Sequence, residues 1–233
     1  MALKSVYVPG ASPANDLIEI TEDEHRHLVV GRARLDELVE VFDGKGNVWT
    51  ASVAETGKRR TLARVHSHRV APVPQNTLIL ALALIRSAAF ELALEKAVEV
   101  GVTRIVPFAA ARSNVTGHSR LDRWQRIVVE AAKQSKRYHL PVIESPLELP
   151  QVLQLPALSR IVFAEHAGAS LKSAVTGAPV LYLVGPEGGW TVGELEMCRA
   201  AGFQQVTLGS GVLRSETAAV AGGLLIRYEL GEI

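Results

Sequence analysis

Two glycine-rich segments near the C-terminal end of the chain hold the residues best suited to chemistry. The first, residues 185–189 (GPEGG), follows an apolar run and precedes Thr191 and Glu194, whose spacing is typical of a helix-capping box. The second occupies residues 208–217 (LGSGVLRSET), again between an apolar run and a helical pattern. Glycine has no Cβ, so backbone amides and carbonyls in such loops can approach a bound molecule closely. Two loops of this kind in neighbouring strand–loop–helix units predict one ligand pocket, although a tight turn explains a single glycine-rich loop equally well.

The sequence motifs of the commonest nucleotide ligands are absent from these loops. No G-x-G-x-x-G segment opens a helix and no Gly-Lys-Ser/Thr follows the glycines, which argues against a nicotinamide cofactor and against a nucleoside triphosphate. The chain has one cysteine, Cys198, which excludes an intrachain disulfide and a cysteine-based zinc site. The single thiol is typical of a reducing compartment. No metal is expected in the site.

The most basic stretch of the chain lies between Arg112 and Arg137. On a helix, the apolar residues of 121–132, Trp124 among them, share one face, so Trp124 is predicted to be a core residue. Opposite them lie the basic residues Arg123, Arg126, Lys133 and Arg137. A second basic cluster, residues 58–60 (KRR) with Arg64 and Arg69, lies in the N-terminal part. Because the formal net charge is only +1, a polyanion would have to bind such local patches, although charged faces are usually just solvated.

The pattern of apolar residues divides the chain into two parts. Residues 1–70 contain short β-like segments with turn signals at 43–44 and 56–57, and they predict a small β-barrel or sheet interrupted by one helix that Thr21 and Glu24 would cap. The uncharged, proline-containing segment 71–75 is expected to be a linker. From residue 76 onward, apolar strands alternate with helices, which predicts an α/β fold with a parallel sheet covered on both faces.

The expected elements of the second part are strands at 78–85, 104–108, 160–164, 180–184 and 205–208 and helices at 90–100, 121–138, 191–201 and 215–230. Those of the first part are strands at 5–8, 17–20, 38–42, 48–53 and 61–66. No apolar run approaches the roughly 20 residues that span a bilayer, and the first residues lack an apolar signal core. We therefore expect a soluble, cytoplasmic protein without a membrane partner.

These motifs resemble the C-terminal signature of the RsmE-type methyltransferases of the SPOUT superfamily. The resemblance rests on residues 185–189, 208–209 and 212–219 (VLRSETAA), and it extends upstream through 95–102 (EKAVEVGV), Pro107, 112–113, 124–127 (WQRI) and 130–135 (EAAKQS). In the first part, His27, 30–32 (VGR) and 42–44 (FDG) also match. The family usually has Val-Leu-Arg where this chain has Val-Gly-Arg, a departure that bears on any role of Arg32.

The resemblance implies a SPOUT domain at residues 76–233, with a trefoil-knotted parallel sheet and helices on both faces, preceded by a PUA-like β-barrel RNA-binding domain at residues 1–70. It implies transfer of a methyl group from S-adenosylmethionine to N3 of a uridine in the 16S rRNA of the small ribosomal subunit. It also implies a homodimer, with the apolar helical segment 218–225 at the subunit surface. On its pattern alone, the core is the favoured place for that segment, and the two interpretations are compatible when the interface is itself a core.

Site residues follow from the resemblance by position. One wall of the methyl-donor pocket would consist of Leu183, Gly185, Glu187, Gly188 and Gly189. The opposite wall would consist of Leu208, Gly209, Val212 and Leu213, with Thr217 and His166 as further donor-binding candidates. The RNA-binding candidates rest on the basic clusters together with the resemblance, and they are Arg32, Arg59, Arg60, Arg112, Arg123, Arg126, Lys133 and Arg137.

The implied reaction assigns tasks to charged residues. The N3 atom of uridine carries a proton at neutral pH, so this proton must be removed and the charge that spreads over O2 and O4 must be stabilised. Arg214 offers fixed donors for that charge, or it pairs with Glu216 or Glu187 and holds the loop. Glu187 is a candidate base, or it binds loop amides, and His25 and His27 are expected to be structural or surface residues.

Three alternatives stay open at the level of the sequence. A related SPOUT enzyme would methylate a ribose 2′-hydroxyl or another base. A ribosome-assembly factor would bind RNA without catalysis, but intact glycine loops and Arg214 argue against it. A small-molecule enzyme with a dinucleotide fold would need the glycine fingerprint that is missing here.

Overall fold

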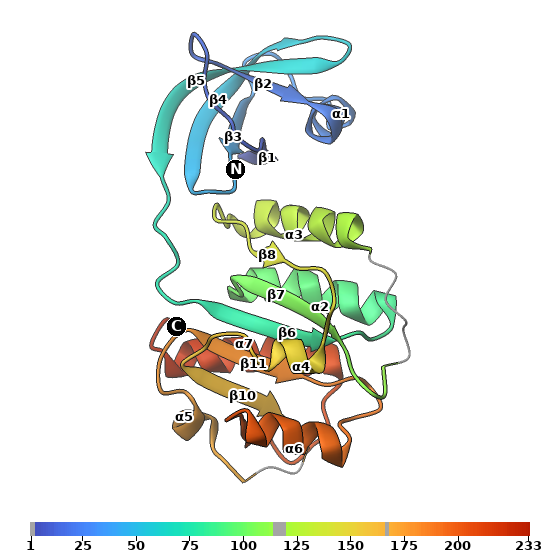
Figure 1. Cartoon of the computed structure of the whole chain (residues 1–233). Coiled ribbons are helices and arrows are strands. Elements are labelled where there is room, and N and C mark those ends of the chain that lie inside the picture. Colours follow the sequence, from blue (N-terminus) through green and yellow to red (C-terminus); the bar gives the residue numbers. More distant parts are fainter. Residues whose placement is uncertain (1–2, 114–119, 166–167) are drawn as a thin grey trace. The chain divides into compact units, whose positions relative to one another are not determined.

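The computed structural model describes residues 3–113, 120–165 and 168–233, and the chain divides into two compact units (Figure 1). The first unit comprises the residues up to Val73 together with Ala132–Leu140, and the second comprises Pro74–Ala131 and Pro141–Ile233. The division after Val73 falls inside the segment 71–75 that was predicted as a linker. The inclusion of 132–140 in the first unit is not predicted by the sequence. Each unit has its own sheet and its own hydrophobic core.

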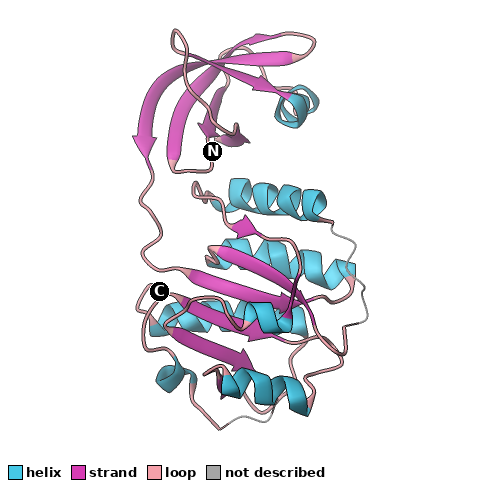
Figure 2. Ribbon diagram, in the orientation of Figure 1, coloured by secondary structure: helices cyan, strands magenta, loops and turns pink. Residues whose placement is uncertain are grey.

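The first unit is built on a five-stranded sheet in the order β1-β3-β4-β5-β2 (Figure 2). Its elements are β1 (Lys4–Tyr7), β2 (Leu17–Thr21), α1 (Glu22–Val30), β3 (Leu38–Phe42), β4 (Asn47–Thr56) and β5 (Arg60–Val70). β1 pairs with β3 in parallel, and the other neighbours are antiparallel. Alternate residues such as Ile18 and Ile20 or Val39 and Val41 are buried, as the period of two along a strand requires. The prediction of a small sheet interrupted by one helix is confirmed.

The turn between β3 and β4 shows why Asp43-Gly44 is a reliable turn signal. The Asp43 carboxylate accepts hydrogen bonds from the Lys45 amide at 2.7 Å and from the Asn47 amide at 3.0 Å. Burial opposes the charged form of Asp43, but hydrogen bonds from Asn47 and from the Lys45 amide outweigh it, so the pKa of this carboxyl lies below its ordinary value. Gly44 has φ +78°, a conformation that side chains rarely adopt.

Residues 132–140 join the first unit through the Glu40 carboxylate of β3. Lys136 donates to it at 3.1 Å and the Tyr138 hydroxyl at 2.5 Å, while Arg69 approaches from β5 at 3.2 Å. Lys136 also donates to the Ser5 hydroxyl of β1. Burial and the hydrogen bond to Glu40 raise the pKa of Tyr138 to about 12. The bonds from Lys136 and Tyr138 to Glu40 link positions nearly a hundred residues apart, so the sequence pattern gives no sign of them.

The beginning of α1 differs from the prediction. The Thr21 side chain makes no capping hydrogen bond, so the expected capping box with Glu24 is wrong. The Glu24 carboxylate instead accepts a hydrogen bond from Lys133 at 2.8 Å, and this ion pair is mostly buried. A full positive charge competes better for a carboxylate than a backbone amide does.

The second unit contains a seven-stranded sheet in which β12, β10, β11, β6, β7 and β8 follow one another and β9 also pairs with β7. Every strand pair that the described residues form in this sheet is parallel. Its strands are β6 (Leu78–Ala83), β7 (Arg104–Ala109), β8 (Val142–Ile143), β9 (Leu147–Glu148), β10 (Ser159–Phe163), β11 (Val180–Val184) and β12 (Gln204–Val206). The helices are α2 (Ser87–Val100), α3 (Leu121–Ser135), α4 (Leu149–Val152), α5 (Leu171–Ala174), α6 (Val192–Ala200) and α7 (Ser215–Glu229). None of these described helices is both long and apolar enough to cross a lipid bilayer.

Helices cover both faces of this parallel sheet, as predicted. On one face, Leu183 of β11 belongs to a buried cluster with Val152 of α4 and Cys198 of α6. The neighbouring residue Tyr182 points to the other face, where its hydroxyl donates to the Ala219 carbonyl of α7 at 3.0 Å. Trp124 of α3 is buried and packs on Phe90 of α2, which confirms that it is a core residue.

Helix α7 packs closely because it carries two glycines. A Cβ at Gly222 would collide with the Phe163 ring, and one at Gly223 would lie 2.8 Å from the Tyr182 hydroxyl. Gly222 and Gly223 face the core of the unit, whereas Leu224 and Leu225 are 44% and 43% exposed. The apolar segment 218–225 therefore has one core face and one face that the chain leaves uncovered.

Candidate functional site

A cleft of about 330 Å³ lies in the second unit at the carboxyl ends of β10, β11 and β12. This edge of a parallel sheet is where open α/β folds bind their ligands. The segments that follow the three strands supply most of the wall. The lining residues are Arg112, Phe163, Ala164, Glu165, Val184, Gly185, Pro186, Glu187, Gly188, Gly189, Trp190, Leu195, Thr207, Leu208, Gly211, Val212, Leu213, Ser215 and Ala218.

The structure brings most of the predicted donor-pocket residues together in this cleft. Both glycine-rich loops contribute to its wall, through Gly185, Glu187, Gly188, Gly189, Leu208, Val212 and Leu213. Leu183 lies deeper, with its side chain in the core between the sheet and α6. Gly209 and Thr217 are exposed and are not part of the lining. His166 lies outside the described residues.

The loop after β11 is held in place by its own tryptophan. The Trp190 indole Nε1 donates to the Phe163 carbonyl at the end of β10, at 2.9 Å, and the ring stacks on Phe108. It fills the space beside Gly185, where a Cβ would lie 2.8 Å from the indole. The Gly185 carbonyl accepts a hydrogen bond from the Ser215 hydroxyl at 2.7 Å, which ties this loop to the beginning of α7. Contacts within the chain therefore fix this wall of the cleft.

Glu187 at the rim of the cleft has a partner that the sequence analysis missed. Arg86, which directly precedes α2, donates from Nε to the Glu187 carboxylate at 3.0 Å. The two predicted roles of Glu187, base or ligand of loop amides, stay predictions. Arg86 could have been found from its place just after β6, because the loops after parallel strands meet at one edge of the sheet.

Arg214 lies between two lining residues, Leu213 and Ser215, but does not itself line the cleft. Its side chain is 81% exposed, and the nearest contact to the Glu216 carboxylate is 3.9 Å. An exposed pair at this distance holds an arginine only weakly. Arg214 does pair with Glu216, as one of its two predictions has it, but the pair is weak and the guanidinium stays accessible to a substrate.

The basic residues predicted to bind RNA differ in their surroundings. Arg112 lines the cleft and donates to the Gly188 carbonyl at 2.9 Å. Arg123 pairs with Glu91 at 2.6 Å, Arg126 is exposed, and Arg137 follows the end of α3 in a half-buried position. Lys133 was expected on the solvent face, but its side chain is only 11% exposed because it pairs with Glu24.

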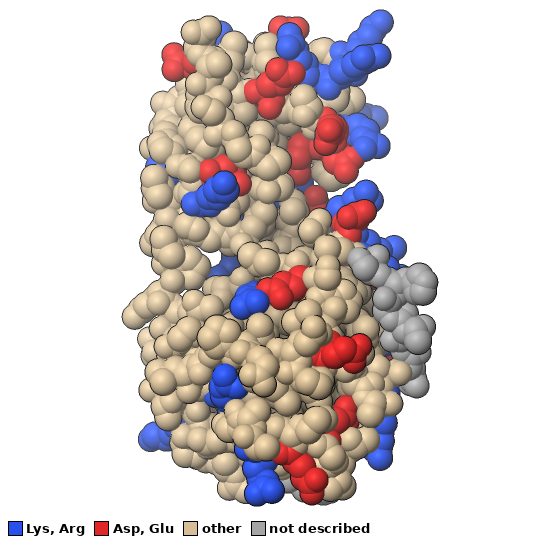
Figure 3. All heavy atoms as spheres, viewed as in Figure 1, with Lys and Arg blue, Asp and Glu red and all other residues tan. Residues whose placement is uncertain are grey.

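In the first unit, the basic candidates all lie at the surface. Arg32 is exposed just after α1, and Arg59 and Arg60 are exposed at the turn between β4 and β5, where Arg60 lies 3.5 Å from Glu19. On the face drawn in Figure 3, basic and acidic side chains are interspersed. Electrostatic attraction of a polyanion would thus depend on local groups.

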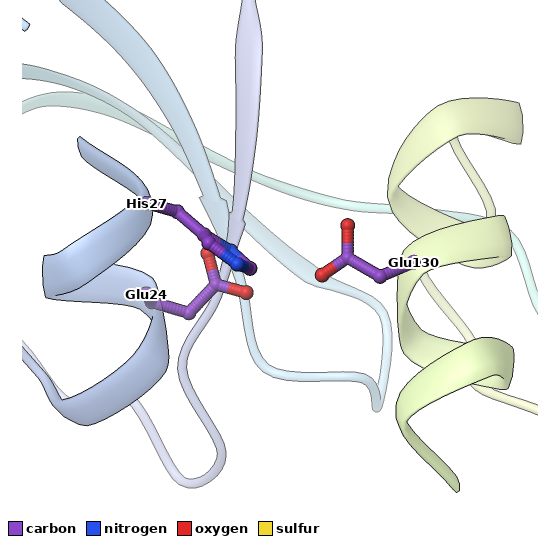
Figure 4. Close-up of side chains that lie close together, drawn as sticks. All are labelled: Glu24, His27 and Glu130. Carbon is purple, nitrogen blue, oxygen red and sulfur yellow. The ribbon is translucent and has the colours of Figure 1, made fainter. Parts of the chain in front are cut away.

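The two histidines of α1 have the structural and surface positions that were expected. His25 is buried and its Nδ1 lies 3.0 Å from the Thr61 hydroxyl. His27 is exposed and projects from α1 one turn after Glu24 (Figure 4). Cys198 is buried in the second unit, and burial together with the nearby Glu194 carboxylate raises the pKa of its thiol to about 12. A thiol with such a pKa is unsuited to nucleophilic chemistry.

Fold and cleft together define a class of protein: an α/β protein that binds a small ligand between loops at the carboxyl edge of a parallel sheet. Residues 72–226 match the model of the RNA methyltransferase domain family, and the chain belongs to this family. The family resemblance found in the sequence is thereby confirmed.

Curated relatives and solved structures agree with this assignment. The chain is 36% identical over 190 residues to ribosomal RNA small subunit methyltransferase E of Synechocystis, a match that covers 76% of this chain and 61% of that protein. The protein of the same name from Rickettsia conorii is 28% identical over 94% of this chain and 93% of the relative.

Among solved structures, ribosomal RNA small subunit methyltransferase E from Neisseria gonorrhoeae bound to S-adenosylmethionine is 30% identical. Its TM-score is 0.91, over 97% of this chain and 98% of that one. A methyltransferase from Legionella pneumophila in complex with the same cofactor gives a TM-score of 0.93 at 25% identity, over 98% of both chains.

Proposed function

We propose that this protein transfers a methyl group from S-adenosylmethionine to N3 of a uridine in the 16S rRNA of the small ribosomal subunit. One observation carries the proposal: both glycine-rich loops of the sequence signature line the same cleft at the carboxyl edge of the sheet. Support comes from the structural relative from Neisseria gonorrhoeae, which was crystallised with S-adenosylmethionine.

The residues of the cleft fit this methyl donor. Its volume of about 330 Å³ is at the small end of typical ligand sites. Phe163, Leu208 and Leu213 offer apolar surface for a flat, neutral adenine, and the glycine loops present backbone groups that can read its polar edge. The Glu165 and Glu187 carboxylates give the wall negative charge suited to a sulfonium. When bound, S-adenosylmethionine supplies an activated methyl group.

Residues at the rim would act on the acceptor. The uridine N3 proton must leave before or during attack, and Glu187, oriented by Arg86, is the proposed base. Arg214 is the proposed donor to the negative charge that spreads over O2 and O4, because its guanidinium is accessible and weakly paired. Alignment of the reacting atoms between these groups would supply much of the rate enhancement.

The remaining parts of the proposal concern assembly and RNA binding. We assign the first unit as a PUA-like β-barrel domain that binds RNA through exposed arginines, among them Arg32, Arg59 and Arg60. The second unit is assigned as a SPOUT domain with a trefoil knot. The exposed side chains Leu224, Leu225 and Tyr228 on α7 would form part of a homodimer surface. The protein would act in the cytoplasm, without a metal.

The test is to incubate the pure protein with labelled S-adenosylmethionine and small ribosomal subunits from a strain that lacks this enzyme. The RNA is then digested and the labelled nucleoside identified by mass spectrometry. N3-methyluridine is the expected product. Label in a ribose or in another base would keep the donor pocket and refute the target, and donor binding without any transfer would favour a ribosome-assembly factor.

A further inference from the structure

The buried carboxylate of Glu194 joins two loops that lie far apart in the sequence. Its Oε2 atom accepts hydrogen bonds from the Thr191 amide and hydroxyl, both at 2.8 Å, which is the capping box predicted from the sequence. Its Oε1 atom accepts a hydrogen bond from the Ala111 amide, also at 2.8 Å, from the loop after β7. Glu194 is only 4% exposed, so these bonds are shielded from competing water.

A second contact joins the same two loops next to the first. Arg112, adjacent to Ala111, donates from Nη1 to the Gly188 carbonyl at 2.9 Å. The two loops approach so closely here that a Cβ at Gly188 would lie 3.0 Å from the Cβ of Arg112. The turn at 110–113 is shaped independently, since the Ser113 amide donates to the Ala110 carbonyl and the Ser113 hydroxyl accepts from the Ala110 amide.

We propose that Glu194 and Arg112 are positioning residues which hold residues 110–113 against residues 187–191 and so preform the wall of the donor cleft. The inference rests on the proposed function and deepens it. Glu194 lies in the first turn of α6, so the loops are fixed to a regular element. A wall that is ordered before the ligand arrives lowers the entropic cost of binding.

This inference reassigns Arg112. The sequence pattern placed it among the residues that bind RNA phosphates, but its guanidinium is already engaged with the Gly188 carbonyl on the cleft wall. We assign this side chain to the wall of the donor cleft and not to a phosphate contact. Loss of Arg112 should then weaken donor binding and leave the electrostatic part of RNA binding unchanged.

The test compares Arg112→Ala, Arg112→Lys and Glu194→Gln with a matched control, Arg199→Ala. Arg199 is an exposed arginine near the end of α6, outside the cleft, and its removal costs the same single charge. The dissociation constant for S-adenosylmethionine is measured by calorimetry. Binding of a 16S rRNA fragment is measured at several salt concentrations. KM for each substrate and kcat follow from methyl-transfer assays.

We expect Arg112→Ala and Glu194→Gln to raise the donor Kd about tenfold, a change that corresponds to about 1.4 kcal/mol. Arg112→Lys should recover part of the affinity, because an ammonium can still donate to the Gly188 carbonyl. KM for the donor should rise more than kcat falls. Because both residues hold the same loops, the effects of the two substitutions should not add. The Kd of the double variant for S-adenosylmethionine should be less than about three times the higher of the two single-variant values.

Two results would overturn the inference while the proposed function stands. One is a donor Kd within about twofold of wild type in Arg112→Ala and Glu194→Gln. The other is a loss of about one unit in the salt slope of RNA binding for Arg112→Ala, which would identify a phosphate contact. If the wild-type chain bound no S-adenosylmethionine, the proposed function would be refuted. The role of Arg112 and Glu194 in donor binding would be refuted as well.

Amide hydrogen exchange, measured without ligand, distinguishes the loss of a loop contact from a general loss of folding. Amide hydrogen exchange of Ala111 should accelerate in Glu194→Gln, because one oxygen of the carboxylate becomes an amide group that cannot accept from both loops. Amides in the core strands β6 and β11 should keep their protection. Unchanged exchange at Ala111 would show that Glu194 does not hold the loop.

Discussion

The two loops of the cleft are both rich in glycine, but they differ in the contacts that fix them to the rest of the second unit. Residues 185–190 are tied to β10, α7 and the loop after β7 by Trp190, Ser215 and Arg112. In residues 208–214, the bond from the Thr207 hydroxyl to the Gly209 carbonyl is a local one, and Val212 is 74% exposed. One wall of the cleft is thus held by several distant contacts, and we infer that the other can adjust to a ligand or a partner. Functional loops that move generally have few contacts of this kind and low local stability.

The largest expected effect falls on the weakly held loop and concerns chemistry. Arg214→Ala should lower kcat about 100-fold, because the variant lacks the proposed donor to the charge on O2 and O4. The free energy of unfolding should change by less than about 0.5 kcal/mol, since the side chain is exposed and weakly paired. Single-turnover methyl transfer and urea denaturation check both values. A normal rate with Arg214→Ala would mean that the charge is stabilised from elsewhere.

A pair of glycine substitutions measures the difference between the walls directly. Gly185→Ala places a methyl group 2.8 Å from the Trp190 indole and should reduce the free energy of unfolding by about 1–3 kcal/mol, with weaker donor binding. Gly211→Ala is the matched control, because a Cβ there meets nothing within 4 Å. Its effect on stability should stay below about 0.5 kcal/mol. Equal losses in the two variants would contradict the comparison.

Removal of one hydrogen bond from the fixed wall should have a smaller effect. Trp190→Phe keeps an aromatic ring beside Gly185 but leaves the Phe163 carbonyl without its donor, which should cost about 1 kcal/mol of stability. Leu213→Ala in the other wall truncates a side chain that is 40% exposed and should cost less. Guanidinium unfolding of both variants tests the order, and a larger loss for Leu213→Ala would reverse it.

The sequence predicted the features that depend on neighbouring residues better than those that depend on contacts distant in the chain. The strand at 180–184 and the capping box of Thr191 and Glu194 depend on neighbours in the chain, and both are confirmed. The capping box of Thr21 and Glu24 was predicted by the same local rule but does not form. The Glu24 carboxylate pairs instead with Lys133, more than a hundred positions later in the chain. Local patterns predict elements well until a distant charge competes for the same group.

The candidate site was predictable to the extent that its residues follow strands. The glycines at 185, 188 and 189 line the cleft because they come directly after β11. Leu183 does not, because a residue inside a strand points to a face of the sheet and not to its edge. The position of Arg86 just after β6 places it at the same edge of the sheet, but its partner Glu187 could be identified only from the fold. The same holds for the pair Arg112–Gly188, which also joins loops after different strands.

The smallest predicted effect concerns the bond from the Thr207 hydroxyl to the Gly209 carbonyl, at 2.8 Å, in the weakly held loop. Thr207→Val keeps the shape of the side chain and removes this donor. The Gly209 carbonyl is exposed and can bind water instead, so stability should fall by less than about 0.5 kcal/mol. The donor Kd should rise about two- to threefold, because a more mobile loop must be ordered on binding. If Thr207→Val weakened donor binding as much as Gly185→Ala, the second wall would also be preformed, and the adjustment that we infer for it would have to be abandoned.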